Sequence, residues 1–378
     1  MNKNLSEQDN KKINIFINNN PVWGGTYQYS ELIIKTLQKK FSQENIKLYF
    51  TTKKNMKLDN QYYLNFNLFQ WILIHFLILF NIKHVAKILT KFKILKLPIS
   101  FFEKNETWIF PSQDLISVLC TGKTVVSIND LMHRYSSFPE TSSTIRKFYR
   151  DYQFNNIARY SKIVLVDSKL GKKHVEDCYG VYNNIKVQYF STQLAQSKII
   201  NSRIDKYIIY PAQYWKHKNH VNLLLAINIL KRKYKDIKLV LIGHKKRNYN
   251  KIFKLTQKLG LEKNIEFLGY ISENNKAELI TNARALINPS YLGPTNIPQI
   301  EAFSLGCPVV MSNVFAAKEQ CGDSVIYFDP NYPESIAASI EKIWATDYLY
   351  ELYSSKSLSR FKNFKFEKFS NDLIRNIF

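Results

Sequence analysis

The stretch Ala285–Val310 limits most strongly what this chain can fold into. It opens with a short apolar run over residues 285–288 that stops at Pro289-Ser290, as expected of a buried parallel strand. A loop of small and turn-forming residues follows, and a second apolar run begins near Pro308. This order predicts a strand, a loop, a short helix and another strand, which is one βαβ unit of a doubly wound sheet.

The helix predicted inside this stretch begins at Asn296 or Ile297, either of which is placed to cap it. Pro298 lies in its first turn, where the missing N–H costs nothing, and Gly306 suits the left-handed stop at its end. A helix N-terminus at the carboxyl edge of a sheet offers free N–H groups to a phosphate. Glu301 lies one turn inside, near enough to accept hydrogen bonds from a ribose.

These residues resemble the signature of the group 1 (family four) retaining glycosyltransferases, which have the two-Rossmann-domain GT-B fold and use a nucleotide-sugar donor. The family motif has two glutamates separated by seven residues, then a helix and a Gly-x-Pro-Val-Val strand. Glu301 matches the second glutamate and residues 306–310 match the strand, whereas Gly293 stands in place of the first glutamate. The resemblance implies a metal-independent donor site with no cofactor, formed by Glu301 and by Gly293, Pro294, Thr295, Asn296 and Ile297.

The composition fits a globular protein of two domains. The 378 residues are 45% hydrophobic and 22% charged, which excludes extensive disorder. Lysine and arginine number 54 against 30 acidic residues, a net charge of +24, but the excess is spread along the chain. No nucleic-acid-binding module is recognised, and the charge alone therefore identifies no partner.

The cysteines and the N-terminus point to a cytoplasmic protein. The four cysteines show no Cys-x-x-Cys pair and no histidine at metal-ligand spacing, so we expect reduced thiols and no bound metal. Residues 1–12 are polar and lack the apolar region of a signal peptide.

Gly24-Gly25 and Thr26 follow the first predicted strand, over residues 13–17, and precede an amphipathic helix. Glycines at a strand-to-helix turn allow the backbone to approach a ligand closely, and a tight turn without a ligand is the alternative. Their position resembles the glycine loop of the family, which faces acceptor and donor phosphate.

Residues 68–80 are the most apolar run, and a lysine-rich segment follows them as far as Lys96. The run is too short to span a bilayer. Two interpretations remain open: a helix lying in an anionic membrane interface, or a buried helix followed by a solvated one, which the sequence favours slightly. In the second interpretation His75 is a core histidine and not a ligand.

Asn129 and Asp130 directly follow a clean buried strand over residues 124–128. The carboxyl end of a parallel strand is where open α/β sheets place ligand groups. The family has His-Asp-Leu here, so Asp130 matches and Asn129 replaces the histidine. Asp130 is expected to orient a sugar hydroxyl or an acceptor nucleophile, with an ordinary cap as the alternative. Asp167-Ser168, after a later strand, is better explained as a helix N-cap.

A second Rossmann-like unit begins with the strand at Tyr207–Tyr210. The basic loop after it precedes a helix, an arrangement that favours an anionic ligand. The family carries an arginine and, five residues later, a lysine that reach the donor diphosphate. Lys218 matches the lysine and Gln213 occupies the arginine position, so Lys216 or His217 would have to supply the missing charge.

Further segments match the family in order over residues 208–330, including Phe267-Leu268-Gly269, which flanks the nucleotide base in the family. We therefore predict two Rossmann-like α/β domains with parallel sheets facing a central cleft. Residues 1–195 form the acceptor-binding domain and residues 205–350 the nucleotide-sugar-binding domain. Residues 351–378 form a C-terminal helix that crosses back to the first domain.

The predicted function is retaining, metal-independent transfer of a sugar from a nucleotide sugar to a glycan, polysaccharide or lipid-linked acceptor, as in lipopolysaccharide assembly. Asp130, Asn129, Lys218 and Glu301 are the expected catalytic residues. The protein is expected in the cytoplasm, with possible peripheral contact to the inner face of the membrane. The alternatives are a catalytically degenerate nucleotide-sugar-binding or scaffold subunit, and a sugar-nucleotide epimerase on the same fold.

Overall fold

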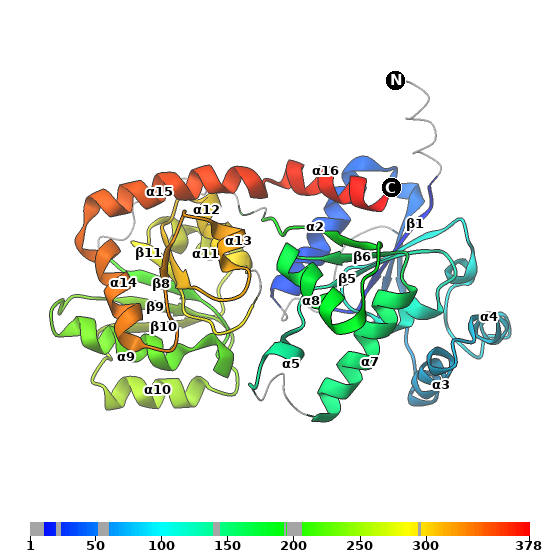
Figure 1. Ribbon diagram of the computed structural model, residues 1–378, viewed down its shortest axis with the longest axis horizontal. Coiled ribbons are helices and arrows are strands. Elements are labelled where there is room, and N and C mark those ends of the chain that lie inside the picture. Colours follow the sequence, from blue (N-terminus) through cyan, green and yellow to red (C-terminus); the bar gives the residue numbers. More distant parts are fainter. Residues whose placement is uncertain are drawn as a thin grey trace, which may run out of the picture. The chain divides into compact units, whose positions relative to one another are not determined.

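The computed structural model describes residues 11–19, 24–51, 60–138, 144–192, 194, 206–293 and 296–378. The chain divides into two compact units. The first comprises Met1–Leu131, Thr144–Tyr189 and Phe369–Phe378, and the second comprises Met132–Ser143 and Phe190–Lys368. Each unit has its own parallel sheet and is described by itself (Figure 1). Residues 196–204, between the two predicted domains, lie outside the described residues.

The described strands of the first unit form one parallel sheet in the order β3-β2-β1-β4-β5-β6-β7. They are β1 (Ile13–Ile17), β2 (Ile46–Phe50), β3 (Gln61–Tyr63), β4 (Thr107–Phe110), β5 (Lys123–Ile128), β6 (Ile163–Val166) and β7 (Ile185–Val187). The central strands are apolar on both faces and almost fully buried, as required when helices cover both sides of a sheet. The strand order reverses between β1 and β4.

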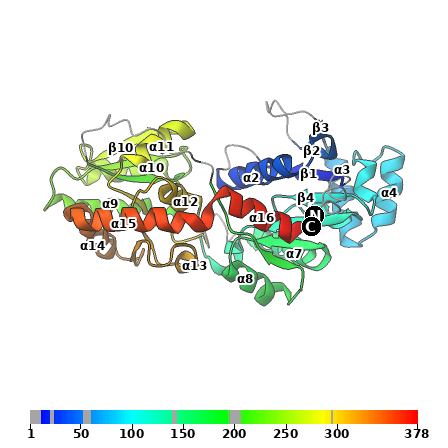
Figure 2. The ribbon, with the colours of Figure 1, turned by 90° about the horizontal axis from the view of Figure 1, so that it is seen from above.

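Helices cover both faces of this sheet (Figures 1 and 2). One layer contains α2 (Gly25–Lys40) and α16 (Phe366–Ile377), which meet through an edge contact between Tyr29 and Phe369. The other layer shares a single apolar core and contains α3 (Leu68–Leu79), α4 (Lys83–Lys91), α7 (Thr144–Tyr160) and α8 (Lys169–Tyr179). Ser168 caps α8 by accepting a hydrogen bond from the Gly171 N–H, which confirms the cap predicted there.

The second unit has a parallel sheet in the order β10-β9-β8-β11-β12-β13. Its strands are β8 (Ile208–Pro211), β9 (Leu239–Ile242), β10 (Ile265–Gly269), β11 (Ala285–Asn288), β12 (Val309–Ser312) and β13 (Ile326–Phe328). The strand order reverses between β8 and β11. In an open α/β sheet, the carboxyl ends of the strands at such a reversal are the usual ligand site.

Two helix layers also enclose the second sheet (Figure 1). One contains α9 (His220–Lys231), α10 (Tyr249–Lys258) and α14 (Pro333–Ala345), and the other contains α11 (Glu273–Thr281), α12 (Ile297–Ser304) and α13 (Ala317–Cys321). The long helix α15 (Asp347–Phe361) packs on α12. The short helix α5 (Met132–Tyr135) follows β5 along the chain but belongs to the second unit.

One expectation from the sequence needs correction. The single C-terminal helix expected over residues 351–378 is two helices, because α15 ends at Phe361 and a 3₁₀ turn precedes α16. For residues 68–80 the sequence left two interpretations open, and α3 is buried on one face and exposed on the other. Among the described helices, none combines the length and the hydropathy needed to cross a bilayer.

Candidate functional site

The strand reversal of the second sheet brings together two loops predicted to bind the donor. The loop after β8 carries Gln213 and Lys218, and the loop after β11 carries Gly293. The carbonyl oxygen of His217 accepts hydrogen bonds from the Tyr291 N–H at 2.9 Å and from the Ser290 hydroxyl at 3.2 Å. Lys218 therefore lies in a loop that is fixed directly to the segment preceding Gly293.

Asn219 holds the same edge together and was not singled out from the sequence. It has left-handed backbone angles (φ 56°, ψ 36°) and is buried at the start of α9. Its amide donates hydrogen bonds to the carbonyl oxygens of Pro289 at 3.0 Å and Pro330 at 2.8 Å. The only local signal is that asparagine tolerates the left-handed region better than most residues.

Gln213, at the position where the family has an arginine, binds a neighbouring aromatic ring. The indole N–H of Trp215 donates to its side-chain oxygen at 2.9 Å. The ammonium of Lys246, in the loop after β9, lies 5.7 Å from the centroid of the Trp215 ring. The structure thus places the Lys246 ammonium beside the aromatic ring that donates to Gln213.

His217 in this loop and His220 at the start of α9 do not supply positive charge near neutral pH. Burial, with smaller contributions from the charges of Lys218 and His220, lowers the pKa of His217 to about 3. Burial and the charge of Lys218 likewise lower the pKa of His220 to about 3, and its ring stacks on Tyr214 with centroids 4.7 Å apart. Because its ring is neutral, His217 does not supply the charge missing at Gln213.

The helix α12 begins as the sequence predicts, with Asn296 at the N-cap and Pro298 in the first turn. The Asn296 side chain makes no capping hydrogen bond. Instead, the side-chain amide of Gln320 binds the backbone of Asn296. Its oxygen accepts from the Asn296 N–H at 3.1 Å, and its nitrogen donates to the Asn296 carbonyl oxygen at 2.8 Å. Gly293 has a φ of 117°, which favours glycine at this position. Pro294 and Thr295 lie outside the described residues.

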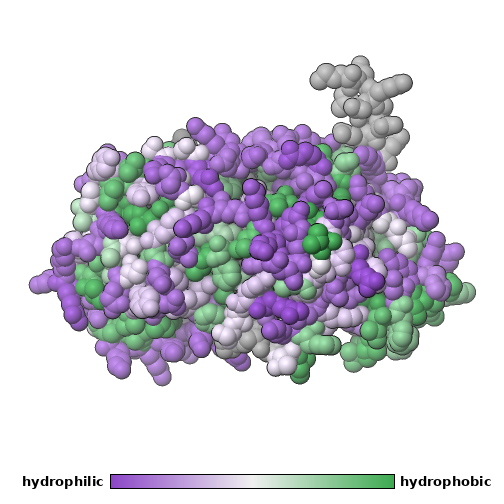
Figure 3. All heavy atoms as spheres, viewed as in Figure 1, coloured by the Kyte–Doolittle hydropathy of each residue, from purple (hydrophilic) through white to green (hydrophobic). Residues whose placement is uncertain are grey.

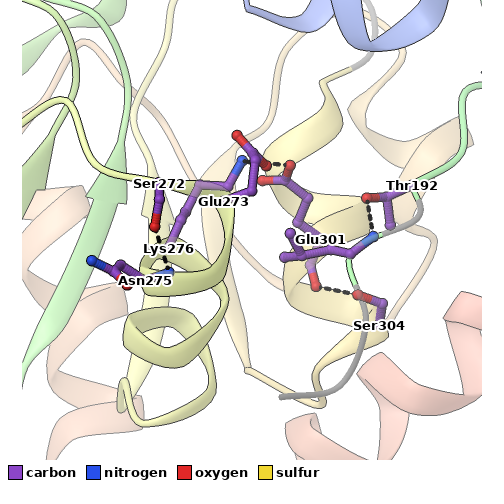
Figure 4. Close-up of polar contacts among 8 residues, drawn as sticks. Thr192, Ser272, Glu273, Asn275, Lys276, Glu301 and Ser304 are labelled. Carbon is purple, nitrogen blue, oxygen red and sulfur yellow. Dashed lines mark hydrogen bonds and ion pairs between the residues drawn. The ribbon is translucent and has the colours of Figure 1, made fainter. Parts of the chain in front are cut away.

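Glu301 is buried on α12 and forms an ion pair with Lys276 of α11 (Figure 4). The Lys276 ammonium lies 2.8 Å from one Glu301 carboxylate oxygen and 2.7 Å from Glu273. Burial opposes the charged form of Lys276, but the two carboxylates outweigh it and raise its pKa. The carboxylate predicted to hold the ribose therefore has a lysine partner, which fixes its orientation one turn inside the helix.

The residues predicted on the first unit follow β1 and β5 at the carboxyl edge of its sheet. Asn129 and Asp130 come directly after β5 and are half-buried. Gly24 and Gly25 are exposed at the start of α2. The carbonyl oxygen of Thr26 accepts from the Asn19 amide and from the Ser30 hydroxyl, both at 3.1 Å. These contacts fix the start of α2 beside the end of β1.

Asp114, which was not predicted, lies at the same edge in the loop after β4. Its carboxylate accepts hydrogen bonds from the Ser112 hydroxyl at 2.7 Å and from the Asn18 amide at 3.0 Å. Burial raises the pKa of Asp114 to about 6, while these two hydrogen bonds act to lower it. Because Asn18 follows β1, this buried carboxyl lies at the strand reversal of the first sheet.

The described residues contain no group of three or more histidine, cysteine, aspartate or glutamate side chains placed to hold a metal ion. The four cysteines are all free thiols. Cys120, Cys307 and Cys321 are buried and Cys178 is half-buried.

A family model for the glycosyl transferases group 1 matches residues 194–359. Among curated proteins, O-antigen chain mannosyltransferase B of Escherichia coli is 29% identical over 169 residues, 44% of each chain. O-antigen chain mannosyltransferase RfbU of Salmonella typhimurium is 23% identical over 213 residues, 56% of this chain and 59% of that protein. The matched segment thus spans roughly half the length of these relatives.

The fold resembles solved glycosyltransferase structures over almost the whole chain. HepE of Anabaena, solved with UDP and glucose, superposes with a TM-score of 0.73 at 15% identity, covering 97% of this chain and 98% of that one. WaaG, a glycosyltransferase involved in lipopolysaccharide biosynthesis, gives a TM-score of 0.73 at 13% identity, covering 97% and 99%. The two Rossmann-like units predicted from the sequence are thereby confirmed as a GT-B-type fold, and residues 194–359 are similar to the glycosyl transferases group 1.

Proposed function

We propose that this protein transfers a hexosyl group from a nucleoside-diphosphate sugar to a glycan or lipid-linked acceptor, with retention of anomeric configuration and without a metal. The observation that carries the proposal is the edge between β8 and β11. There the Lys218 loop is hydrogen-bonded to the segment that leads into the N-terminus of α12. A lysine beside a helix N-terminus is an arrangement that binds a diphosphate.

The same groups account for catalysis. When the bond between the anomeric carbon and the diphosphate oxygen breaks, negative charge grows on the leaving diphosphate. Lys218 and the N–H groups at the start of α12 are fixed in advance and stabilise that charge more in the transition state than in the bound donor. Glu301, held by Lys276, accepts hydrogen bonds from the ribose. Asp130 and Asn129 orient the acceptor hydroxyl.

The relatives support a narrower choice of substrate. The curated proteins of known activity are named as mannosyltransferases of O-antigen chains. We therefore propose a mannosyl nucleotide as the preferred donor and a growing surface polysaccharide as the acceptor. We further propose that the reaction takes place in the cytoplasm, at the inner face of the membrane.

The first test is thermal unfolding with a panel of UDP-, GDP-, TDP- and ADP-sugars. A donor at a hundredfold excess over its Kd stabilises the native state by about 2.7 kcal/mol, so one nucleotide class should raise the unfolding temperature. Lys218→Ala should weaken binding of that donor roughly tenfold or more, because a hydrogen bond to a charged group is lost. Unchanged donor affinity in a folded Lys218→Ala protein would remove Lys218 from the site.

Lys246 is the proposed source of the positive charge missing at Gln213. Lys246→Ala should weaken donor binding, with a smaller loss than Lys218→Ala, because Lys246 is expected to act on the diphosphate from a longer distance and Coulomb attraction falls with distance. Lys245→Ala is the matched control, since its ammonium lies 4.7 Å from the centroid of the Tyr249 ring, on α10. Equal effects of the two substitutions would show that only the general charge of the loop matters.

A scaffold subunit that binds the donor without transferring the sugar is the second candidate. It is favoured by Gly293 and by the contact of Gln213 with Trp215, because both positions carry charged groups in the family. Donor binding with neither transfer nor donor hydrolysis, over a panel of mannosylated lipid acceptors, would support this candidate over the enzyme.

A further inference from the structure

The helix α3 is apolar on both faces, and only one of them is covered. Gln70, Ile74, Leu77 and Ile78 are buried against the core of the first unit. The opposite face exposes a helical stripe of large apolar side chains, with Phe69 65% and Phe76 52% exposed. The complete stripe is Leu68, Phe69, Ile72, Phe76, Leu79 and Phe80. Surface helices of globular proteins normally present polar residues to water, so this face requires a partner.

The segment after α3 adds exposed apolar residues and positive charge. Ile88, Phe92 and Ile94 are exposed on α4 and just beyond it. Lys91 and Lys96 are exposed beside them. Residues 68–102 contain five lysines and no aspartate or glutamate. Figure 3 shows apolar atoms gathered over α3 and α4, next to polar ones.

The start of α7 extends the same surface. The Nε2 atom of His75 on α3 lies 3.0 Å from the Tyr149 hydroxyl on α7, and the two rings are 5.9 Å apart. Phe148, next to Tyr149, is 78% exposed, and Ile145, one turn earlier, is exposed as well. His75 thus connects two helices that both present apolar side chains to water.

We propose that the α3–α4 surface, meaning the exposed stripe of α3 together with Ile88, Phe92, Ile94, Ile145 and Phe148, docks on an anionic lipid bilayer. An amphipathic surface of this kind enters the region between headgroups and acyl chains, and flanking lysines contact anionic headgroups. Because residues 68–102 contain five lysines and no acidic residue, this segment carries positive charge, which complements the negative charge of such a membrane.

A second copy of this chain fits the surface less well. In a two-fold dimer the same patch lies on both partners, so the lysines of one copy would face the lysines of the other. No acidic group of residues 68–102 is available to balance them. An anionic bilayer satisfies both the apolar stripe and the lysines, and it is therefore the occupant to which we commit.

The test is co-sedimentation of the full chain with vesicles of phosphatidylcholine, with and without phosphatidylglycerol. The parent protein should bind the anionic vesicles more tightly, and binding should weaken as salt rises. Changing Phe69, Ile72 and Phe76 together to glutamine should reduce binding on the order of a hundredfold or more, because three apolar side chains no longer enter the bilayer. Lys91→Gln with Lys96→Gln should reduce it about thirtyfold.

The matched control replaces three equally exposed apolar residues elsewhere, Val181, Tyr332 and Tyr348, by glutamine. It should bind vesicles as the parent does. Both triple variants should unfold at the parent's temperature, since the replaced side chains are exposed. Vesicle binding that is equal in the two triple variants would overturn the proposal. A second result would also overturn it. In that result the parent is a dimer in sedimentation velocity, the Phe69, Ile72 and Phe76 variant is a monomer, and neither protein binds vesicles.

The docking surface does not depend on the proposed donor site. Donor-induced stabilisation, measured without vesicles, should be the same in the parent and in the Phe69, Ile72 and Phe76 variant. If the parent binds anionic vesicles but no nucleotide sugar, the proposed function fails and the docking surface stands. If it binds a nucleotide sugar but no vesicles, the docking surface fails alone.

Discussion

Removing the lysine that pairs with Glu301 should destabilise the second unit in a way that depends on pH. Glu301 is 2% exposed and Lys276 only 13%, so the pair is largely withdrawn from water. Lys276→Met keeps the length and apolar stem of the side chain but removes the ammonium. The substitution leaves a buried carboxylate without its cation, which is among the most costly single changes in a folded protein.

The size of the effect follows from the two ways in which the carboxylate can respond. Leaving a buried charge unpaired costs about 3–5 kcal/mol. Taking up a proton instead costs about 1.4 kcal/mol for each pH unit above roughly 4.3, the value at which a glutamate carboxyl titrates in water. That alternative limits the loss to about 4 kcal/mol at pH 7 and to about 1 kcal/mol at pH 5.

The lysine itself adds no pH dependence in this range. The Lys276 pKa is raised, because the charges of Glu301 and Glu273 outweigh the effect of burial. A raised lysine pKa stabilises the fold fully below the unfolded value of about 10.4, and that stabilisation is lost only as pH rises through the folded value. Any difference between pH 5 and pH 7 therefore reports on the carboxylate.

The assay is calorimetric unfolding of the parent and the variant at pH 7 and pH 5. A loss of 3–4 kcal/mol should lower the unfolding temperature of the unit containing residues 190–368 by roughly 6–16 °C at pH 7, and by much less at pH 5. Lys356→Met is the control, because its partner Asp323, 3.0 Å away, is 88% exposed and the change should be within the scatter of the measurement. A Lys276→Met loss that is equal at both pH values, or no larger than that of the control, would refute the reasoning.

Three further predictions concern single buried positions. The raised pKa of Asp114, about 6, means that its contribution to stability is present below about 3.9 and declines as pH rises to about 6. The parent should therefore lose on the order of 2–3 kcal/mol of unfolding free energy between pH 4 and pH 6, measured by urea unfolding, and Asp114→Asn should not show this loss. Gly243→Ala should lower the free energy of unfolding, measured by urea unfolding, by about 2 kcal/mol or more, since the new methyl would collide with the Ala212 carbonyl oxygen; an unchanged urea midpoint would contradict this. Burial raises the pKa of three thiols to about 12, so in the native protein Ellman's reagent should titrate Cys178 and not Cys120, Cys307 or Cys321.

The features read correctly from the sequence are those with local signals. The strand, helix and second strand within residues 285–310 are all present, because the apolar runs, Pro298 and Gly306 each act over a few residues. Gly306 has a φ of 69°, as its predicted role at the end of α12 requires. The alternation of strands and helices likewise indicated the parallel sheets.

The features missed depend on contacts between distant elements. Lys276 pairs with Glu301 across two helices, and nothing in the local sequence distinguishes it from other surface lysines. For α3 the sequence left a buried helix and an interfacial helix open, since an apolar run alone does not show how much of it the core will cover. The break between α15 and α16 has no proline or glycine to mark it, because residues 362–365 are Lys-Asn-Phe-Lys.

The left-handed Asn219 has a consequence for the thermodynamics of ligand binding. One amide group links the start of α9 to the ends of two strands, β11 and β13, through the carbonyl oxygens of Pro289 and Pro330. The segments at Asn219, Pro289 and Pro330 are therefore held together before any ligand arrives. A ligand entering such a preformed site loses little affinity to loop ordering, so the conformational entropy cost of binding at this edge should be small.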